Sequence, residues 1–177
     1  MKIWKIVPAL PEHIPAIAAR MREEDRREVW ASHRHTPGQA LENGLARSEL
    51  AWTCFVHGKP AFMWGAARQG SLISRTGAPW LLGTEGIYMV RREFLKQSRA
   101  YVELMQKRFP RLENFVHAEN RLSIRWLQWC GFVLDDIPEL INDEDFFMFR
   151  RNADVYTGSS NDCGDRHLNC RQHVRAE

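Results

Sequence analysis

The sequence predicts one mixed α/β domain, in which a layer of strands is covered by helices. The chain has 177 residues, enough for one ordinary domain and too few for two. Strand-like and helix-like segments alternate along it, as is typical of a mixed layer. Hydrophobic residues make up 44% and charged residues 27%, so the chain can build a core without disulfides.

The first fifty residues are expected to form one strand and two helices. Residues 2–7 alternate imperfectly before Pro8 and predict a strand. One helical face then carries Ile14, Ile17, Ala18 and Met21. The charged run 20–28 either ends this helix or continues it with a solvated face. The segment Thr36-Pro37-Gly38-Gln39 has the pattern of a capping box and starts the second helix.

The middle of the chain is rich in β-forming residues. Residues 51–56 and 61–66 flank a turn at 57–60 and predict an antiparallel hairpin. Residues 69–79 are expected to form a loose connection, because their apolar residues show no period. Residues 80–84 then predict a short buried strand.

The second half of the domain carries the clearest helix, over residues 94–109, whose apolar residues recur at offsets of three and four. Residues 112–117 predict a strand, and 120–130 predict an amphipathic helix. Two further strands are expected at 132–134 and 146–149. The predicted order is therefore β-α-α-β-β-β-α-β-α-β-β.

The composition changes to small and polar residues near residue 152. This change predicts a domain over 1–151 and a flexible tail over 152–177. The tail holds four residues of the two types that most often bind zinc, namely Cys163, His167, Cys170 and His173. Their spacing does not match the common zinc motifs, so incidental Cys and His residues are the favoured interpretation and no metal is predicted. Two other cysteines, Cys54 and Cys130, lie in apolar runs and are expected to be buried.

Charge and hydropathy narrow the range of partners. The chain has 25 basic and 22 acidic residues, and their alternation along the sequence argues against a nucleic-acid partner. No stretch without Asp, Glu, Lys or Arg is longer than that over 76–84, which has nine residues, far fewer than the roughly 20 of a membrane-spanning helix. Because no export signal is visible, we expect the protein to stay in the cytoplasm where it is made. Most of the seven tryptophans are expected in the core or at a subunit interface.

The segment 120–132 carries a family resemblance. It has Asn120 after a strand, Ser123 three residues later, and Gly131-Phe132 closing the helix. This pattern, at its place in the element order, resembles the GNAT (Gcn5-related N-acetyltransferase) superfamily. The resemblance covers roughly residues 1–150 and implies a mostly antiparallel sheet with helices on both faces. Together with the run 80–84 and a long helix that lacks a glycine loop, this segment also resembles a narrower branch of small GNAT-like phage proteins, which includes internal virion protein A of short-tailed phages.

The resemblance implies a binding site for acetyl-CoA where the long helix begins. In GNAT enzymes glycines at this point let backbone N–H groups approach the pyrophosphate. Here the stretch 86–94 has one glycine, placed too early. By resemblance, the thioester carbonyl would bond an N–H near Met89, and the phosphates would meet Val90, Arg91 and Arg92.

Two more cofactor contacts are implied within the helix over 120–130. Asn120 would hydrogen-bond the pantetheine arm and also cap that helix, and Ser123 would lie beside it. Many GNAT enzymes place a tyrosine that reprotonates the leaving thiolate seven residues after this Asn. Position 127 is Leu here, which has no proton to give.

The residues expected to assist catalysis are carboxylates and a histidine. Glu85 follows the fourth strand, where GNAT enzymes often keep a catalytic carboxylate; an ordinary polar strand end is an equal alternative. His117, on the fifth strand, is a second candidate, although a structural histidine is the favoured interpretation. Glu24, Asp25 and Glu28 could bind a basic substrate, but a solvated helix face is favoured for them.

Two hypotheses of function follow from the resemblance. In the first, the protein is an acetyl-CoA-dependent N-acetyltransferase, with direct acyl transfer to an amine on a small molecule or a protein. In the second, it is a non-catalytic GNAT-fold protein of a phage particle or its assembly, or a binder of a host protein. The degenerate glycine loop and Leu127 favour the second, and the element order is compatible with both.

Overall fold

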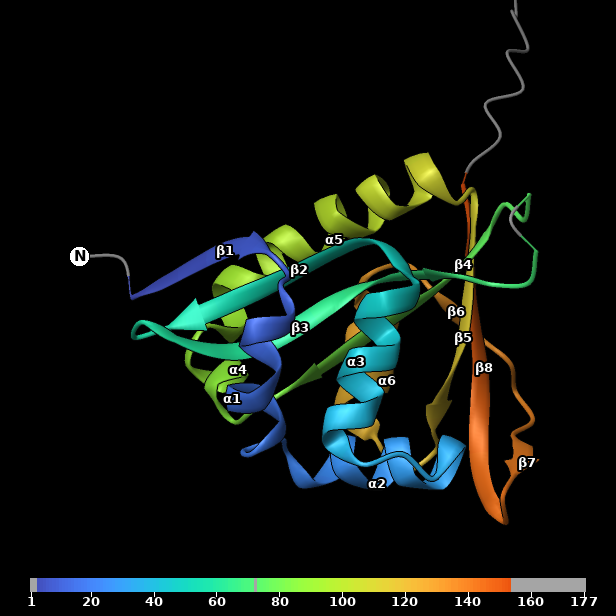
Figure 1. Cartoon of the computed structure of the whole chain (residues 1–177). Coiled ribbons are helices and arrows are strands. Elements are labelled where there is room, and N and C mark those ends of the chain that lie inside the picture. Colours follow the sequence, from blue (N-terminus) through green and yellow to red (C-terminus); the bar gives the residue numbers. More distant parts are fainter. Residues whose placement is uncertain (1–2, 72, 154–177) are drawn as a thin grey trace, which may run out of the picture.

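The computed structural model describes residues 3–71 and 73–153. In this part of the chain one eight-stranded sheet has the order β1-β2-β3-β4-β5-β8-β6, with β7 paired to β8 (Figure 1). Every pair is antiparallel except β4 with β5. The mixed, mostly antiparallel class is therefore confirmed. The strands are β1 Trp4–Pro8, β2 Ser48–Val56, β3 Lys59–Arg68, β4 Thr76–Gly83, β5 Arg111–His117, β6 Val133–Leu134, β7 Glu139–Ile141 and β8 Glu144–Asn152.

Helices cover both faces of the sheet. Alternate residues of β3 separate the two cores, because Trp64 lies in one hydrophobic cluster with Phe94, and Met63 lies in the other with Ile17 and Leu41. The first cluster is covered by α5 and α6, and the second by α1, α2 and α3. A 3₁₀ turn, η1, spans Pro11–His13, and the α-helices are α1 Ile14–Ala18, α2 Glu23–His33, α3 Pro37–Arg47, α4 Gly86–Met89, α5 Arg91–Arg108 and α6 Arg121–Trp129.

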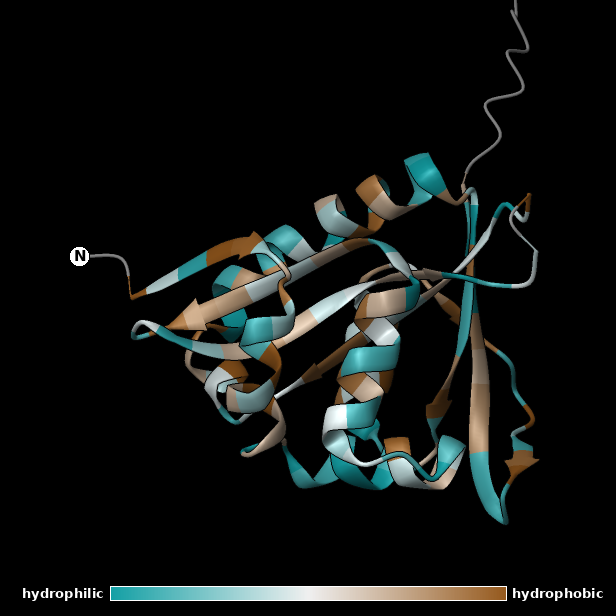
Figure 2. Cartoon of the chain, viewed as in Figure 1, coloured by the Kyte–Doolittle hydropathy of each residue, from teal (hydrophilic) through white to brown (hydrophobic). Residues whose placement is uncertain are grey.

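Local signals in the sequence are confirmed where they are strongest. The Thr36 hydroxyl accepts from the N–H of Gln39, whose side chain accepts from the N–H of Thr36, and this capping box starts α3. The predicted hairpin turn holds His57 and Gly58 at positive φ, as a two-residue turn requires. Helix α5 alternates hydrophobic and hydrophilic residues, which Figure 2 displays along its length.

The charged run 20–28 ends the first helix, as one of its two interpretations expects, but it also starts a second helix that neither interpretation predicts. The first helix stops at Ala18, Met21 makes an isolated bridge to Thr84, and a separate helix, α2, begins at Glu23. Backbone pairing causes the break, because the N–H of Arg22 donates to the Gly83 carbonyl at 2.8 Å. A helix continued through this point would lose that bond to the sheet.

Residues 76–79, expected to be part of a loose connection, belong to β4 instead. They pair with β3, where Pro79 lies opposite Ala66. The glycine in this segment serves packing rather than a turn. A Cβ on Gly77 would lie 2.7 Å from the Phe109 ring, so only glycine fits there. The sequence also gave no sign of β7, a three-residue strand joined to β8 by a two-residue turn.

Buried cysteines and an aromatic cluster complete the core. Cys54 and Cys130 are buried as expected, and burial raises the pKa of the Cys54 thiol to about 12. Trp64 is 2% exposed within the aromatic cluster, whereas Trp30 and Trp129 are more than half exposed. None of the helices in residues 3–71 and 73–153 is long and apolar enough to cross a membrane.

Candidate active site

The sheet opens between β4 and β5. These parallel strands pair only where they begin, at Thr76 with Arg111 and at Gly77 with Leu112. Beyond these pairs they diverge toward the end of the molecule where α2 lies, as Figure 1 shows. Each strand keeps its other neighbour, β3 or β8, to the end. The inner edges of β4 and β5 are therefore left without a strand partner.

Pro79 lies where the two strands separate. In a strand the N–H and C=O of one residue point to the same neighbour, and the carbonyl of Pro79 points to β5, where it accepts from the Asn114 side chain at 3.0 Å. Proline has no N–H to offer β5 at this point. The ladder therefore cannot continue past Pro79, and an asparagine side chain bonds the carbonyl that remains.

Helix α2 closes the open end of the gap with two acids on one helical face. Asp25 accepts from the N–H of Gly83, the last residue of β4, at 2.8 Å. Glu28, three residues later, accepts at 3.4 Å from the N–H of His117, the last residue of β5. The Arg22 guanidinium binds both oxygens of Asp25, at 3.1 and 2.6 Å, in a buried ion pair. Glu24 is exposed, as the expected solvated face requires. For Asp25 and Glu28 that expectation is wrong, because their carboxylates cap the ends of two strands.

A cavity of about 1100 Å³ occupies the gap. Residues 78–82 of β4 and 114–116 of β5 line its middle. Helices from both faces of the sheet contribute to its wall, so the cavity extends from one side of the sheet to the other. The polar or titratable residues of the wall are Arg22, Glu28, Ser32, His33, His35, Asn43, Arg47, Gln69, Tyr88, Arg91, Asn114 and Ser123.

Glu28 supplies the one side-chain carboxyl group among the described residues of this wall, and its pKa is strongly raised. Burial raises its pKa from the usual value to about 7, and the charge of Asp25 adds to the rise. Hydrogen bonds from Asn120 and from the His117 N–H lower the pKa but do not offset burial. Both bonds go to Oε2, the one from the Asn120 side chain at 2.8 Å. Oε1 accepts no hydrogen bond from the described residues, so it is available to a ligand.

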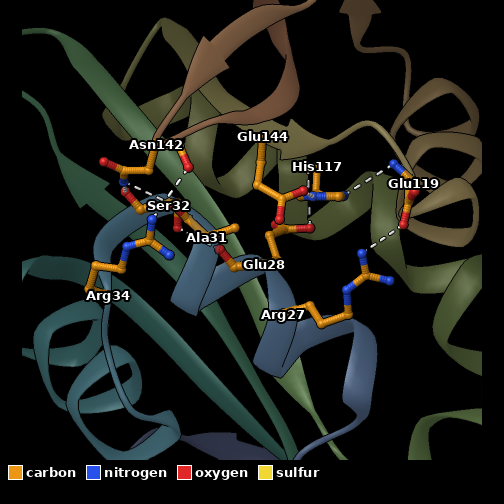
Figure 3. A network of polar contacts seen from close by, with 9 residues as sticks. All are labelled: Arg27, Glu28, Ala31, Ser32, Arg34, His117, Glu119, Asn142 and Glu144. Atoms are coloured by element: carbon orange, nitrogen blue, oxygen red, sulfur yellow. Dashed lines mark hydrogen bonds and ion pairs between the residues drawn. The ribbon is translucent and has the colours of Figure 1, made fainter.

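His117 supports this carboxylate through its backbone rather than its ring. Its Nδ1 accepts from the N–H of Glu119 at 3.2 Å, which leaves the proton on Nε2 to donate to Glu144 at 3.1 Å (Figure 3). The ring is therefore fully bonded, and it does not line the cavity. Figure 3 shows Glu28 on α2 beside the end of β5, where His117 lies.

The turn between β7 and β8 fastens the other end of α2. Asn142, at φ 50°, donates from its side-chain amide to the carbonyls of Ala31 and Ser32, at 2.9 and 3.0 Å. Arg34 donates back to the Asn142 carbonyl at 3.3 Å. The helix that carries Glu28 is thus held near its start by the end of β4 and at its end by the β7–β8 turn (Figure 3).

The start of α5 lies beside the cavity. No carbonyl of α5 itself accepts from the backbone N–H groups of Arg91, Arg92 and Glu93, because they form the first turn of this 18-residue helix. The N–H of Val90 is not free, since it donates to the Ile87 carbonyl at 3.2 Å. The Arg91 side chain lines the cavity. Three amides and the Arg91 guanidinium therefore lie at the predicted phosphate site, which lacks its usual glycines. This donor set fits an anionic phosphate.

The other predicted site residues are divided between the cavity and the surface. Ser123 and Leu127 line the cavity from α6. Asn120 caps α6, as expected, by accepting from the Ser123 N–H at 3.2 Å. Glu85 and Met89 are exposed and do not line the cavity. Their predicted roles, as catalytic base and as amide donor to the thioester, stay predictions.

No metal site is visible in residues 3–71 and 73–153, where no three His, Cys, Asp or Glu side chains gather. The four possible ligands of the predicted tail, Cys163, His167, Cys170 and His173, lie outside the described residues.

Comparison with known proteins identifies the class of fold. No protein-family model matches the chain, and no curated protein sequence is similar to it. Solved structures do match. Ribosomal-protein-S5-alanine acetyltransferase from Vibrio fischeri is 14% identical with a TM-score of 0.61, over 88% of this chain and 96% of that one. An acetyltransferase of the GNAT family from Streptococcus pneumoniae is 14% identical with a TM-score of 0.54, over 84% and 99%.

A third match was solved with its ligand. RimL, a ribosomal L7/L12 α-N-protein acetyltransferase in complex with coenzyme A, is 12% identical with a TM-score of 0.62, over 87% of this chain and 96% of that one. The chain therefore has the GNAT fold across its described part. At these identities the likeness establishes the fold, and the function has to be argued from the site.

Proposed function

We propose that the protein is an acetyl-CoA-dependent N-acetyltransferase. One observation carries the proposal: the cavity crosses the sheet through the β4–β5 gap and exposes the free oxygen of a carboxyl group whose pKa is about 7. A transferase needs its two substrates to meet at one point, and a cavity reached from both faces provides that arrangement.

The two sides of the cavity suit different substrates. The side formed by α5 and α6 offers the amides at the start of α5, the Arg91 guanidinium and Ser123, which fit the phosphates and the pantetheine arm of acetyl-CoA. The side formed by α2 and α3 carries Glu28 and would receive the amine. The gap between the strands is where thioester and amine would come into contact.

Glu28 is the group that can prepare the amine for attack. An ammonium ion must lose a proton before it becomes a nucleophile, and Oε1 of Glu28 can take that proton. A carboxylate with a pKa of about 7 is a far better proton acceptor near neutral pH than an ordinary one. The nitrogen then attacks the thioester carbonyl and a C–N bond forms. The C–S bond breaks as its electron pair leaves on sulfur, and the nitrogen loses its second proton to water, from which the thiolate takes up a proton.

The leaving thiolate needs little help. A thiol has a pKa of about 8.5, so the thiolate departs without being protonated in the same step. Leu127 lines the cavity and supplies no proton there. We therefore assign the base to Glu28, with Glu85 as the alternative carboxylate and His117 as a positioning residue that holds Glu28 by its backbone.

A second candidate is a non-catalytic protein of the same fold, acting in a phage particle or its assembly or on a host protein. Two observations favour it: Leu127 replaces the usual proton donor, and the Val90 amide is used inside the chain. Both candidates share the fold, so they differ in one property, the capacity to bind and use acetyl-CoA.

Acetyl-CoA binding to the purified full-length chain tests the proposal. At 100 times Kd the ligand adds about 2.7 kcal/mol to stability, which raises the Tm by about 5–10 °C for a domain of this size. The double variant R91M/R92M should lose most of that rise. Its matched control, K59M/R75M, removes two positive charges outside the cavity and should keep it.

Turnover completes this test. The wild-type chain should consume acetyl-CoA in the presence of a primary amine, and E28Q should be slower than E85Q. An unchanged Tm at millimolar acetyl-CoA, without turnover, would contradict the enzymatic function and favour the second candidate.

A further inference from the structure

We infer that the acceptor is an amine that also carries an anionic group, which Arg47 binds with the help of His33 and His35. This inference rests on the proposed function and specifies its substrate class. It starts from the wall of the cavity on the α2–α3 side, the side opposite the start of α5. Three cationic or titratable side chains meet there: His33 at the end of α2, His35 in the connection, and Arg47 at the end of α3.

The balance of charge on this wall is positive. Glu28 is the one acid among the described residues that line the cavity. Arg22 also lines it, but its charge is matched by the buried carboxylate of Asp25. A substrate with two positive charges would meet one carboxylate and a cationic wall, and like charges repel in a partly enclosed site. A substrate with one amine and one acid would find a partner for each group.

Arg47 is the arginine on this side of the cavity that has no partner among the described residues. It makes no ion pair or hydrogen bond with any described residue, whereas Arg68 and Arg108 nearby in the fold both bind Glu49. Its charge is felt in the cavity, because it lowers the pKa of His33 together with burial, the main cause, and with His35. The two imidazole rings stack at 5.3 Å. A bound anion would relieve this crowding of positive charge.

The spacing along α2 limits the length of the substrate. Glu28 and His33 are five residues apart, a rise of about 7.5 Å along the helix. Three extended bonds span at most about 3.6 Å, so the two bonds between the amine and the carboxyl carbon of an α-amino acid are too few. Four or five bonds between amine and acid match the wall better. The inferred class is a small ω-amino acid, or another amine with its anionic group at that distance.

The test compares three primary amines of one length with acetyl-CoA: 4-aminobutyrate, butylamine and 1,4-diaminobutane. We expect the highest kcat/KM for 4-aminobutyrate and the lowest for the diamine. R47M should lower kcat/KM for 4-aminobutyrate by about 10–100-fold, the usual range for a lost charged hydrogen bond, and leave butylamine nearly unchanged. R47K should recover part of the loss, and R47E should favour the diamine.

Two controls show whether the change in kcat/KM comes from Arg47 itself and which kind of anion Arg47 binds. K59M removes the same single charge from the first residue of β3, outside the cavity, and should not change the ranking. Replacing 4-aminobutyrate with 2-aminoethyl phosphate distinguishes a carboxylate acceptor from a phosphate acceptor, since both present an anion to Arg47.

A binding measurement covers the case of slow turnover. In the complex with coenzyme A, 4-aminobutyrate or 2-aminoethyl phosphate should raise the pKa of His33, followed by NMR, and butylamine should not. Equal kcat/KM for butylamine and both anionic amines, or no change at His33 with either anion, overturns this inference. If the wild-type chain binds acetyl-CoA, either of those two results overturns the substrate class and leaves the proposed function standing. If the wild-type chain does not bind acetyl-CoA, the proposed function itself is contradicted.

Discussion

Glu28 combines a structural bond and an exposed proton acceptor in one side chain. Its Oε2 accepts from Asn120 and from the last N–H of β5, while Oε1 has no partner among the described residues. The bonded oxygen fixes the geometry of the free one. The same burial that raises the pKa also makes the ionised form costly, so a useful base here destabilises the fold near neutral pH.

The first prediction concerns E28Q and catalysis. Glutamine keeps an oxygen for Asn120 and for the His117 N–H, but it cannot take a proton. We expect kcat to fall by about 10²–10⁴-fold, and the rise of wild-type activity with pH through about 7 to disappear. The measurement is a pH–rate profile for both proteins. E24Q, an exposed neighbour on the same helix, is the matched control; an identical profile for E28Q would exclude Glu28 as the base.

The second prediction concerns E28Q and stability. The pKa of Glu28 is about 7 in the folded protein and near 4.5 when exposed, so the folded state holds its proton more tightly. The associated stability is complete below pH 4.5 and is lost as pH rises through about 7. E28Q should therefore match the wild type at pH 4.5 and exceed it by up to about 3 kcal/mol at pH 8. Urea unfolding at the two pH values measures this, and E24Q should show no such difference.

At the scale of elements, the sequence predicts best where the signal is local. A capping box, a two-residue hairpin turn and an amphipathic period each depend on a few adjacent residues, and α3, the β2–β3 hairpin and α5 are all confirmed. The failures are long-range. The break before α2 depends on a bond to Gly83, about sixty positions away in the chain, and nothing near Arg22 announces it.

The third prediction concerns Asn114 and the opening of the sheet. Its side chain holds the carbonyl of Pro79 across the gap, so N114A should leave that carbonyl without a partner. We expect a loss of about 1–3 kcal/mol in the free energy of unfolding. N152A removes an exposed asparagine at the end of β8 and is the control. Equal stability of N114A and N152A in urea would show that water replaces the lost bond.

At the scale of the whole molecule, the fold could be predicted and the site only in part. The order of elements and the Asn120 helix led to the GNAT fold, which the solved structures confirm. The start of α5 was located correctly, although Val90 does not have a free amide there. Glu28 was named but interpreted as solvated, because burial by β4 and β5 is a property of the assembled sheet. Pro79 alone predicts a loop. The pairing of β4 with β3 and β5 shows that it lies instead in a strand, at the point where β4 and β5 separate.

The fourth prediction treats the domain as one cooperative unit. A ligand that spans the cavity contacts both halves of the sheet, so acetyl-CoA at 100 times Kd should slow global hydrogen exchange by about 100-fold. The slowest amides of the β2–β3 pair and of the β5–β8 pair should slow by the same factor. Slowing on one pair alone would show that the halves unfold separately.

The short pairing of β4 with β5 has a mechanical consequence. Two residue pairs join the halves of the sheet at one end, and from there each inner edge is bonded to side chains rather than to another strand. A change in the angle between the halves would leave the ladders of both halves intact, and it would act instead on the side-chain bonds from Asn114 and α2. Ligands of different thickness would set different angles between β4 and β5. Because α2 is bonded to the ends of both strands, its tilt would change with that angle.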